Sequence, residues 1–409
     1  MPSTKNANPM LTVFLTVFID LLGVTIIIPI LAPLLVDSDV ILGPEFSDAQ
    51  RKIIYGFLLG SFSILQFFSA PFLGTLSDKY GRRKVMNYSL LVTLLGYIVF
   101  VIAIRQNSLI GLFFGRSLAG MASGNLAVIN SAIADISKPE DKAKNFGVVG
   151  MAFGVGFVIG PVLGGLLSSN EIVSWFNYST PFMFSALLVV LNILLVYFRF
   201  PETLKELNPD AAISPLNGFK NIGKAFRNPE MRYIFLSIFF FYFGFSFFTQ
   251  FFQIFLIEKF SFGTKEIGYL FGYVGIAIAI TQGILVRILS KRFAPRPMAT
   301  VTLLGLVGAF VVLLIPDTVP GLYMLIPAVA LFQGLTVPNL SAIVSNSAPP
   351  HMQGETLGIQ QSMQSLANMI PPIVGGFAVS VFLTLPIWLA ASCTLIAWVV
   401  FMFSKRASS

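Results

Sequence analysis

Long runs of apolar residues, separated by polar turns, dominate this chain. A helix needs about 20 apolar residues to cross a bilayer, and these runs are long and continuous rather than the short alternating segments of a barrel. The pattern therefore predicts an all-α polytopic membrane protein with twelve transmembrane helices. The expected spans are 10–36, 51–77, 84–105, 108–135, 145–168, 177–199, 230–258, 265–291, 297–316, 320–345, 353–381 and 384–404.

The longest polar interruption follows the sixth apolar run. It divides the predicted helices into an N-terminal half, 1–199, and a C-terminal half, 231–409, joined by a cytoplasmic linker, 200–230. Lys220, Lys224 and Arg227 give this linker a basic amphipathic segment that suits a membrane surface. The other turns are short, which leaves no room for a catalytic domain outside the bilayer. An enzyme is therefore not expected.

Composition supports a membrane protein, with 56% hydrophobic residues, 11% charged residues and a mean hydropathy of +0.83. The net charge of +8 does not indicate a nucleic-acid partner, because the basic residues follow a membrane topology. With a cytoplasmic N-terminus, 20 of the 26 Lys and Arg residues fall on the inner side, 5 on the outer side, and Arg116 within a span. We expect a multi-pass protein of the cell (inner) membrane, monomeric, with both termini in the cytoplasm.

Several kinds of chemistry are missing from the sequence. There is one histidine and one cysteine, and nothing matches the phosphate-binding pattern GxxxxGK[ST]. No metal or cofactor is therefore expected. Energy for transport has to come from an ion gradient or from the gradient of the solute itself.

Asp20 stands about ten residues into the first predicted helix, near the middle of the bilayer. A carboxylate at that depth costs roughly 2.5–3.5 kcal/mol on insertion scales, which makes it a candidate for function. Apolar surroundings disfavour the charged form, so a carboxyl reached by water from alternate sides can bind and release a proton. The alternative is an aspartate permanently hydrogen-bonded to neighbouring helices.

Arg116 is the other charge well inside a span, and we expect it to couple to Asp20. At 100° per residue, Arg116 shares a helix face with Gly120 and Ser123, whereas Asn125 points away and ranks lower as a site residue. The alternative for Arg116 is a side chain that reaches the outer interface along its apolar stem.

Uncharged polar residues gather on single faces of several predicted helices, as expected for a cavity that binds a small-molecule substrate. Their alternative role is hydrogen bonding between helices. The predicted cavity residues are Gln66, Tyr242, Ser246, Gln250, Gln253, Gln333, Thr336, Gln361, Gln364 and Asn368.

Two motifs carry a resemblance to a known family. One is the loop GTLSDKYGRRK at 74–84, and the other is a glycine series inside the fifth apolar run, made of Gly147, Gly156, Gly160, Pro161, Gly164 and Gly165. Alone, such glycines indicate a close helix-packing seam, and a Gly-Pro break in a helix needs burial against neighbours. Together the motifs resemble the signature loop and the fifth-helix antiporter motif of the major facilitator superfamily, in its drug/proton antiporter branch.

The resemblance implies two six-helix halves that alternate access to a central site. It also implies a conformational latch at the inner surface, formed by Gly74, Asp78, Gly81, Arg82, Arg83 and Asp135, in which Asp135 pairs with Arg82. The helix around Asp20 is similar to the first helix of tetracycline/proton antiporters. Gly96, however, occupies the position where those proteins carry an aspartate in the third helix, which argues against a tetracycline–metal substrate.

We therefore expect a secondary transporter that exports small amphiphilic or hydrophobic compounds in exchange for protons. One alternative is a uniporter, or a lipid or sugar-type efflux carrier without proton coupling, in which Asp20 only binds substrate. Another, from a different class, is a membrane scaffold or receptor that moves nothing.

Overall fold

The computed structural model describes residues 9–136, 142–204, 231–347 and 353–404, with 207, 216, 219–220, 222–223 and 227 between them. Lys224 and most of the predicted amphipathic linker segment lie outside these residues. The described chain is helical, with no strand in it.

Its elements are α1 (Pro9–Thr25), η1 (Pro33–Asp37), α2 (Asp48–Tyr80), α3 (Arg82–Arg105), α4 (Leu109–Ala122), α5 (Asn125–Ile136), α6 (Lys142–Leu167), α7 (Thr180–Arg199), α9 (Arg232–Phe260), α10 (Thr264–Ile280), η3 (Thr281–Leu285), α11 (Val286–Leu289), α12 (Pro295–Val312), α13 (Val319–Asn346), α14 (Gln353–Met369), α15 (Pro371–Val381) and α16 (Leu385–Phe403).

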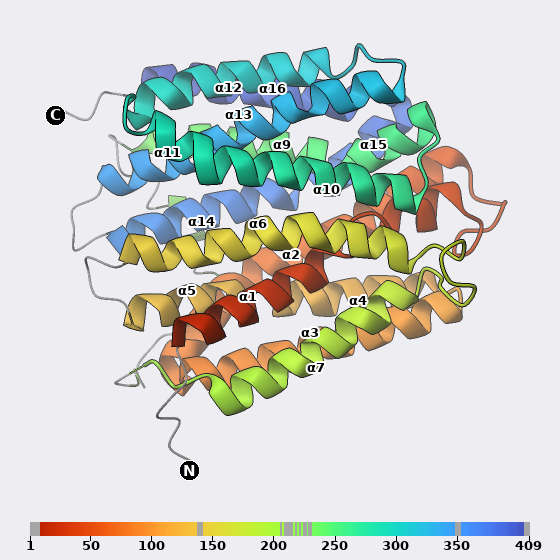
Figure 1. Ribbon diagram of the computed structural model, residues 1–409, viewed down its shortest axis with the longest axis horizontal. Coiled ribbons are helices and arrows are strands. Elements are labelled where there is room, and N and C mark those ends of the chain that lie inside the picture. The colour runs from red at the N-terminus through yellow and green to blue at the C-terminus, as the bar shows by residue number, and fades with distance from the viewer. Residues whose placement is uncertain are drawn as a thin grey trace. The chain divides into compact units, whose positions relative to one another are not determined.

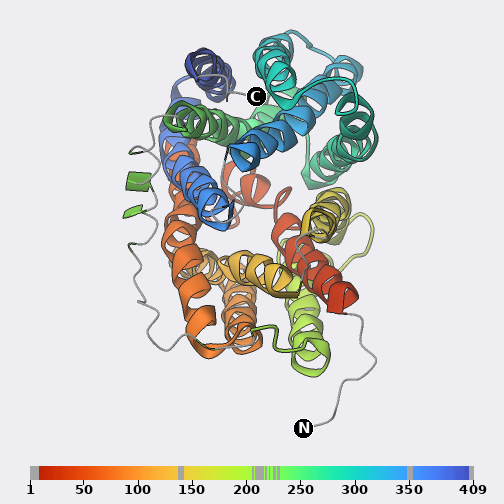
Figure 2. The same ribbon diagram turned by 90° about the vertical axis from the view of Figure 1, so that its left-hand side faces the viewer.

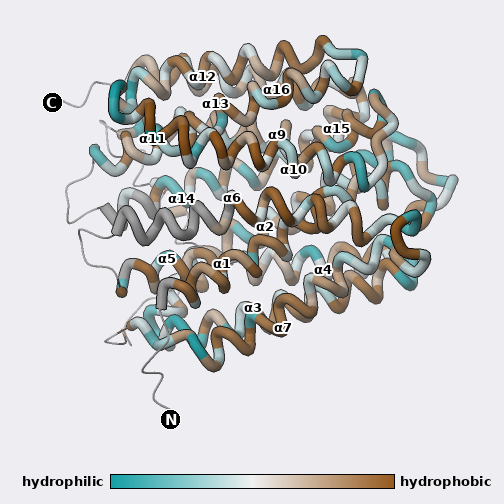
Figure 3. Tube along the Cα trace, viewed as in Figure 1, coloured by the Kyte–Doolittle hydropathy of each residue, from teal (hydrophilic) through white to brown (hydrophobic). Residues whose placement is uncertain are grey.

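The helices account for the predicted spans. Within the described residues, nine helical stretches are long and apolar enough to cross a membrane, and Leu11–Thr25 and Gly154–Leu167 are shorter apolar helices. The pair α14 and α15 covers the eleventh span. Figure 3 shows hydrophobic residues along the helices, with hydrophilic residues gathered at many of the turns between them. The predicted all-α class is confirmed.

Several predicted spans are interrupted. The fourth is divided into α4 and α5 by a turn at Ser123 and Gly124, where a Cβ on Gly124 would lie 2.7 Å from the carbonyl oxygen of Ser69 in α2. The eleventh is divided before Pro371, because a proline lacks the N–H that would continue the helical ladder. The expected Gly-Pro break in the fifth span does not occur, since α6 continues through Pro161.

The contacts divide the chain into two compact units. The first contains Met1–Glu45, Ile64–Asn217 and Gly263–Gly272, and the second contains Phe46–Ser63, Gly218–Phe262 and Tyr273–Ser409. Both α2 and α10 therefore contribute one end to each unit.

In the first unit, α3, α4 and α7 run side by side (Figure 1). Buried side-chain hydrogen bonds join its helices: Ser89 Oγ donates to the carbonyl of Ala122 at 2.7 Å, and Asn192 Nδ2 donates to the carbonyl of Thr16 at 3.1 Å. Such bonds satisfy polar groups that have no water available within a bilayer. They hold α4 against α3, and α7 against α1.

In the second unit, α9 packs along α16, and α12 packs against α13 and α16 (Figure 2). Phe248 of α9 and Phe310 of α12 have ring centroids 5.0 Å apart. The start of α2 also belongs here: a Cβ on Gly56 would lie 2.5 Å from the carbonyl of Pro372, so only glycine permits this approach. One turn away, Lys52 Nζ lies 2.5 Å from Glu258 Oε1 of α9.

Candidate functional site

Asp20 lies in the last third of α1 and meets the first residue of α5. Asn125 Nδ2 donates a hydrogen bond to Asp20 Oδ2 at 3.4 Å. Asn125 is 2% exposed, whereas Asp20 is half-buried. Asn125 Oδ1 is buried and accepts no hydrogen bond from the described residues. Beside the Asp20 carboxyl, the Asn125 amide therefore donates one hydrogen bond through Nδ2, while its Oδ1 has no donor among the described residues.

Asn125 lies next to Asp20, although the sequence ranked it low because it was expected to point away from Arg116. That expectation assumed one unbroken helix, with a constant rotation of 100° per residue from Arg116 to Asn125. Because the helix stops at Ala122 and restarts at Asn125, that rotation does not hold across the turn. The pair Ser123-Gly124 inside an apolar run is the sequence signal for such a break.

Tyr97 of α3 lies close to α1 near Asp20. A Cβ on Gly23 would lie 2.9 Å from the Tyr97 hydroxyl oxygen, so the tyrosine fits against α1 just beyond Asp20. The Tyr97 side chain is 2% exposed. Arg116 itself is half-buried in α4. Tyr97 was not among the predicted site residues, and only the tertiary contact of its side chain with α1 at Gly23 places it there.

Gly96 lies against α4, so the third helix has no space for an acid at this position. A Cβ there would be 3.3 Å from the carbonyl oxygen of Gly115 and 3.4 Å from the backbone nitrogen of Ala119. A carboxylate at residue 96 would have to push the two helices apart. The glycine thus closes the α3–α4 contact, leaving the carboxyl chemistry of this region to Asp20.

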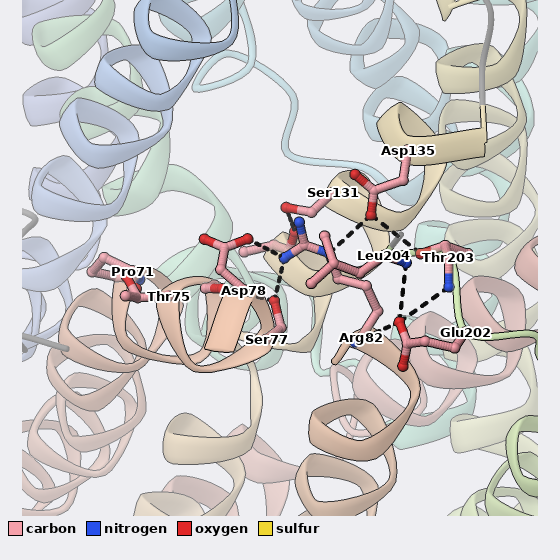
Figure 4. A network of polar contacts seen from close by, with 12 residues as sticks. Pro71, Thr75, Ser77, Asp78, Arg82, Ser131, Asp135, Glu202, Thr203 and Leu204 are labelled. Carbon is pink, nitrogen blue, oxygen red and sulfur yellow. Dashed lines mark hydrogen bonds and ion pairs between the residues drawn. The ribbon is translucent and has the colours of Figure 1, made fainter. Parts of the chain in front are cut away.

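A polar cluster surrounds Arg82 at the turn between α2 and α3 (Figure 4). Arg82 Nη1 lies 2.6 Å from Asp78 Oδ1 and donates to Ser77 Oγ at 2.6 Å, while Nε donates to Asp135 Oδ2 at 3.0 Å. The Arg82 side chain is 6% exposed. The structure therefore brings together Asp78, Arg82 and Asp135 from the predicted latch.

Gly81 makes the turn possible. Its φ of 95° lies in a region that side chains with a Cβ rarely adopt, and a Cβ would lie 2.6 Å from Glu202 Oε2. A Cβ on Gly74, in contrast, would meet no other atom within 4 Å, so close packing does not require glycine there. Of these two motif glycines, the structure gives a physical reason for Gly81 alone.

Glu202, which follows α7, caps the start of α3. Its Oε1 accepts from the backbone N–H of Arg82 at 2.9 Å, and its Oε2 accepts from the N–H of Arg83 at 3.2 Å. The next residue, Thr203, donates from Oγ1 to Asp135 Oδ2 at 3.2 Å. Glu202 and Thr203 were not among the predicted site residues, although the Pro-Glu-Thr-Leu sequence at 201–204 directly after the sixth span could have indicated them.

Arg83 points to the end of α7. Its guanidinium donates to the carbonyl of Tyr197 and lies 5.5 Å from the centroid of the Tyr197 ring. A cation near the C-terminus of a helix is favoured by the partial negative charge there. Arg82 and Arg83, adjacent in sequence, therefore join α3 to two different helices, α5 and α7.

The glycine series of α6 packs onto α1 directly after Asp20. A Cβ on Gly156 would lie 3.2 Å from Leu21 Cβ, and Cβ atoms on Gly160 and Gly164 would collide with Thr25 and Ile26. Thr25 Oγ1 also makes a hydrogen bond of 2.9 Å with the carbonyl of Gly156. Backbone thus lies against backbone in the turn of α1 that follows the carboxyl.

The last glycine of the series faces another helix. A Cβ on Gly165 would lie 2.7 Å from the carbonyl of Thr264 at the start of α10, and a Cβ on Gly268 would lie 2.6 Å from the carbonyl of Pro161. α6 therefore has two glycine faces, one for α1 and one for α10. Gly147 belongs to α6, but its surroundings lie outside the described residues.

The predicted cavity residues have different surroundings. Thr336 is fully buried and makes a 2.9 Å hydrogen bond with Thr302 of α12, so it joins two helices instead of lining an open surface. Ser246 and Gln253 are 2% and 5% exposed, and each has a buried oxygen without a hydrogen bond among the described residues. Gln361 is exposed, and the half-buried members are Gln66, Tyr242, Gln250, Gln333, Gln364 and Asn368.

Gln360, one residue before a predicted cavity residue, was missed. Its Nε2 donates to Ser341 Oγ of α13 at 3.0 Å, and its Oε1 is buried without a hydrogen bond among the described residues. No group of three or more His, Cys, Asp and Glu side chains in the described part of the chain has the arrangement of a metal site. α9 and α14 thus carry uncharged hydroxyl and amide groups at the predicted cavity positions.

Apolar helices long enough to cross a membrane, with a carboxyl and an arginine inside apolar segments, are typical of a polytopic membrane transporter. A family profile for the Major Facilitator Superfamily matches residues 13–372 and 289–408. The chain belongs to the major facilitator superfamily.

Relatives and solved structures agree with this assignment. The chain is 30% identical over 377 residues to the class C tetracycline resistance protein of Escherichia coli, covering 90% of this chain and 89% of the relative. It is 28% identical over 405 residues to mouse major facilitator superfamily domain-containing protein 10, covering 89% and 85%. The crystal structure of the human organic anion transporter MFSD10 matches with a TM-score of 0.74 at 23% identity, covering 98% of this chain and all of that one. A D-xylose–proton symporter matches with a TM-score of 0.76 at 15% identity, covering 97% and 98%.

Proposed function

We propose that this chain exports small amphiphilic or hydrophobic compounds in exchange for protons. Two six-helix halves, 1–199 and 231–409, alternate access to a site between the two sides of the membrane. The protein acts as a monomer in the cell (inner) membrane, with both termini in the cytoplasm. Tetracycline resistance proteins among its relatives support an export function.

The observation that carries the proposal is the hydrogen bond between Asp20 and Asn125. An amide can donate to a carboxylate and can accept from a protonated carboxyl, so Asn125 can serve both states of Asp20 by turning its side chain. Asp20 as a residue is half-buried, and the hydrogen bond from buried Asn125 is the contact of its carboxyl that carries this proposal. This arrangement supports Asp20 as a proton carrier rather than as a structural aspartate with permanent hydrogen bonds.

The packing around Asp20 supports coupling between protonation and helix movement. The next turn of α1 lies backbone to backbone on α6, so a small displacement of α1 changes the contacts of Gly156, Gly160 and Gly164. The Arg82 cluster acts as the latch, with charged contacts that stabilise one conformation. A preference of a few kcal/mol between conformations is enough for protonation to shift their populations.

Reconstitution into liposomes tests the proton step. The interior carries a pH-sensitive dye, and tetracycline, ethidium and fluorescein are supplied one at a time as a zwitterionic, a cationic and an anionic probe. We expect at least one probe to move protons in the opposite direction. Asp20→Asn should abolish the proton signal, while Glu171→Gln, which changes a carboxylate 74% exposed at the surface, should preserve it.

The outcomes separate the alternatives. Proton exchange that persists in Asp20→Asn would refute the role of Asp20. Probe flux without any proton signal in the unaltered protein would indicate a uniporter or an uncoupled efflux carrier. If neither the three probes nor a wider set of solutes moved, the scaffold or receptor interpretation would replace transport.

A second candidate substrate class is organic anions. The observation that favours it is Arg116, a half-buried guanidinium inside an apolar span. A human structural neighbour bears the name organic anion transporter. If an anion binds here, fluorescein flux should fall about tenfold or more in Arg116→Gln and be partly kept in Arg116→Lys, because a desolvated charge pair contributes at least about 1.4 kcal/mol. Ethidium flux should not fall with it.

A further inference from the structure

A small pocket opens on the surface between the end of α2 and the start of α3. Its volume is about 260 Å³, and it is lined by Leu76, Tyr80, Lys84, Val85 and Tyr88. None of these side chains belongs to the Asp20 site or takes part in the Arg82 cluster. The pocket therefore needs an explanation of its own.

The polar side of the pocket is basic and aromatic. Lys84 is exposed, with Nζ 5.9 Å from the centroid of the Tyr80 ring, and Tyr80 and Tyr88 are 48% and 59% exposed. Two acids of the same turn have other partners, since Asp78 pairs with Arg82 and Glu202 accepts from backbone N–H groups. The positive charge of Lys84 is thus available to an anion, next to two phenolic hydroxyls that can donate.

The other side of the pocket continues into an apolar strip along α3. Leu91, Leu95, Ile98 and Ile102 are 47%, 49%, 43% and 48% exposed, and they follow Lys84 and Tyr88 at steps of three or four residues. Residues at that spacing share one face of a helix. A basic, aromatic pocket therefore stands at one end of a face that is otherwise aliphatic.

We propose that this pocket binds the headgroup of an anionic phospholipid. The phosphate lies against Lys84, the hydroxyls of Tyr80 and Tyr88 donate to headgroup oxygens, and an acyl chain runs along the strip from Leu91 to Ile102. Tyrosines are enriched at the level of lipid headgroups, and basic residues at a helix end attract anionic lipids. A free phosphate has no acyl chain to contact the apolar strip. A zwitterionic headgroup would bring its own cation close to Lys84, which is unfavourable.

A lipid titration tests the proposal. The full chain is purified in dodecyl maltoside micelles and its Tm is measured against increasing phosphatidylglycerol, phosphatidylcholine or inorganic phosphate, with matched acyl chains for the two lipids. We expect phosphatidylglycerol to raise Tm in a saturable way, because a ligand of the folded state stabilises it by mass action. Lys84→Gln should weaken the apparent affinity about fivefold, since one lysine near a lipid surface contributes about 1 kcal/mol.

Two variants serve as controls. Lys84→Arg keeps the charge and should keep the affinity, which shows that the pocket still folds when residue 84 is changed. Lys291→Gln removes an exposed lysine from the α11–α12 turn and should leave the titration unchanged. Native mass spectrometry of the same samples should show fewer retained phosphatidylglycerol molecules for Lys84→Gln alone.

Four results would overturn the proposal. The first is an unaltered protein whose Tm does not respond to phosphatidylglycerol, and the second is an equal response in Lys84→Gln and the unaltered protein. The third is an equal response to phosphatidylcholine, which would show general solvation by lipid. A response to inorganic phosphate matching that to phosphatidylglycerol would identify a phosphate site instead of a lipid site.

Discussion

Two turns each contain an arginine that links the start of one helix to the end of another, but with different neighbouring residues. They are the turn between α2 and α3 and the turn between α11 and α12. In the first, Arg83 binds the carbonyl of Tyr197 at the end of α7 and lies over the Tyr197 ring. In the second, Arg296 binds the carbonyl of Ser404 after α16, donates to Ser404 Oγ at 2.8 Å, and lies 5.2 Å from the centroid of the Phe401 ring. Each arginine fastens the start of one helix to the end of another.

The two turns differ in their acids. α3 starts after Gly81, which has no side chain to cap the helix, and the carboxylate of Glu202 supplies that cap. α12 starts with Pro295, whose missing N–H leaves one fewer donor to satisfy. Where the first turn has Asp78 five residues before its arginine, the second has Lys291. The comparison indicates that the first turn combines a helix-to-helix contact with a network that includes acids, whereas residues 290–296 of the second turn contain no acid.

The largest expected effect comes from Arg82→Ala. The change leaves Asp135 and Asp78, which are 22% and 43% exposed, without the guanidinium that joins them. Because Arg82 is buried but its partners are partly exposed, we expect a loss of about 3 kcal/mol, the lower end of the cost of breaking a buried ion pair. The free energy of unfolding in micelles, from denaturant titration, measures the loss. A loss under about 1 kcal/mol would show that solvent already screens this cluster, and the contrast with the second turn would fail.

Gly81→Ala should cost about 2 kcal/mol. The positive φ disfavours any residue with a Cβ by about 1–2 kcal/mol, and the new methyl group would displace the Glu202 carboxylate. The matched control is Gly74→Ala in the same motif, where the Cβ meets open space and the stability should not fall. Equal losses at the two positions, measured by the same denaturant titration, would contradict the role assigned to the turn geometry.

Glu202→Gln should cost about 1 kcal/mol, because the amide keeps one acceptor oxygen but loses the charge that favours a helix N-terminus. The loss should shrink in about 1 M salt, since the Debye length falls to about 3 Å. The second turn has no such acid, and mutations there should show little dependence on salt. A salt-independent loss in Glu202→Gln would remove the electrostatic distinction between the turns.

Arg296→Ala should have the smallest effect, about 1 kcal/mol in the same denaturant titration, from the contacts with the carbonyl and hydroxyl of Ser404 and a partly exposed cation–π contact. Arg296→Lys should recover part of it, because a lysine keeps the charge but not the planar contact with Phe401. If Arg296→Ala lowered the free energy of unfolding as much as Arg82→Ala, contacts of Arg296 other than those with Ser404 and Phe401 would have to contribute.

The helical class and the approximate positions of all twelve spans follow from the sequence alone, because a bilayer demands long apolar helices and their length is visible in the chain. Asp20 was found in the same way, since a carboxylate stands out in an apolar run. The grouping of Asp78, Arg82 and Asp135 was implied by the family resemblance, and the sequence does not bring these residues together by spacing.

Only the tertiary structure decided which groups meet Asp20 and Arg82. Asn125 reaches Asp20 because the fourth span breaks at Ser123 and Gly124, and Glu202 reaches Arg82 from 120 residues away. A helix wheel describes directions within one unbroken helix, but the packing of one helix on another sets the contacts between them. The sequence determined that this chain spans a membrane as helices, whereas close packing at glycines and turns determined which polar side chains became neighbours.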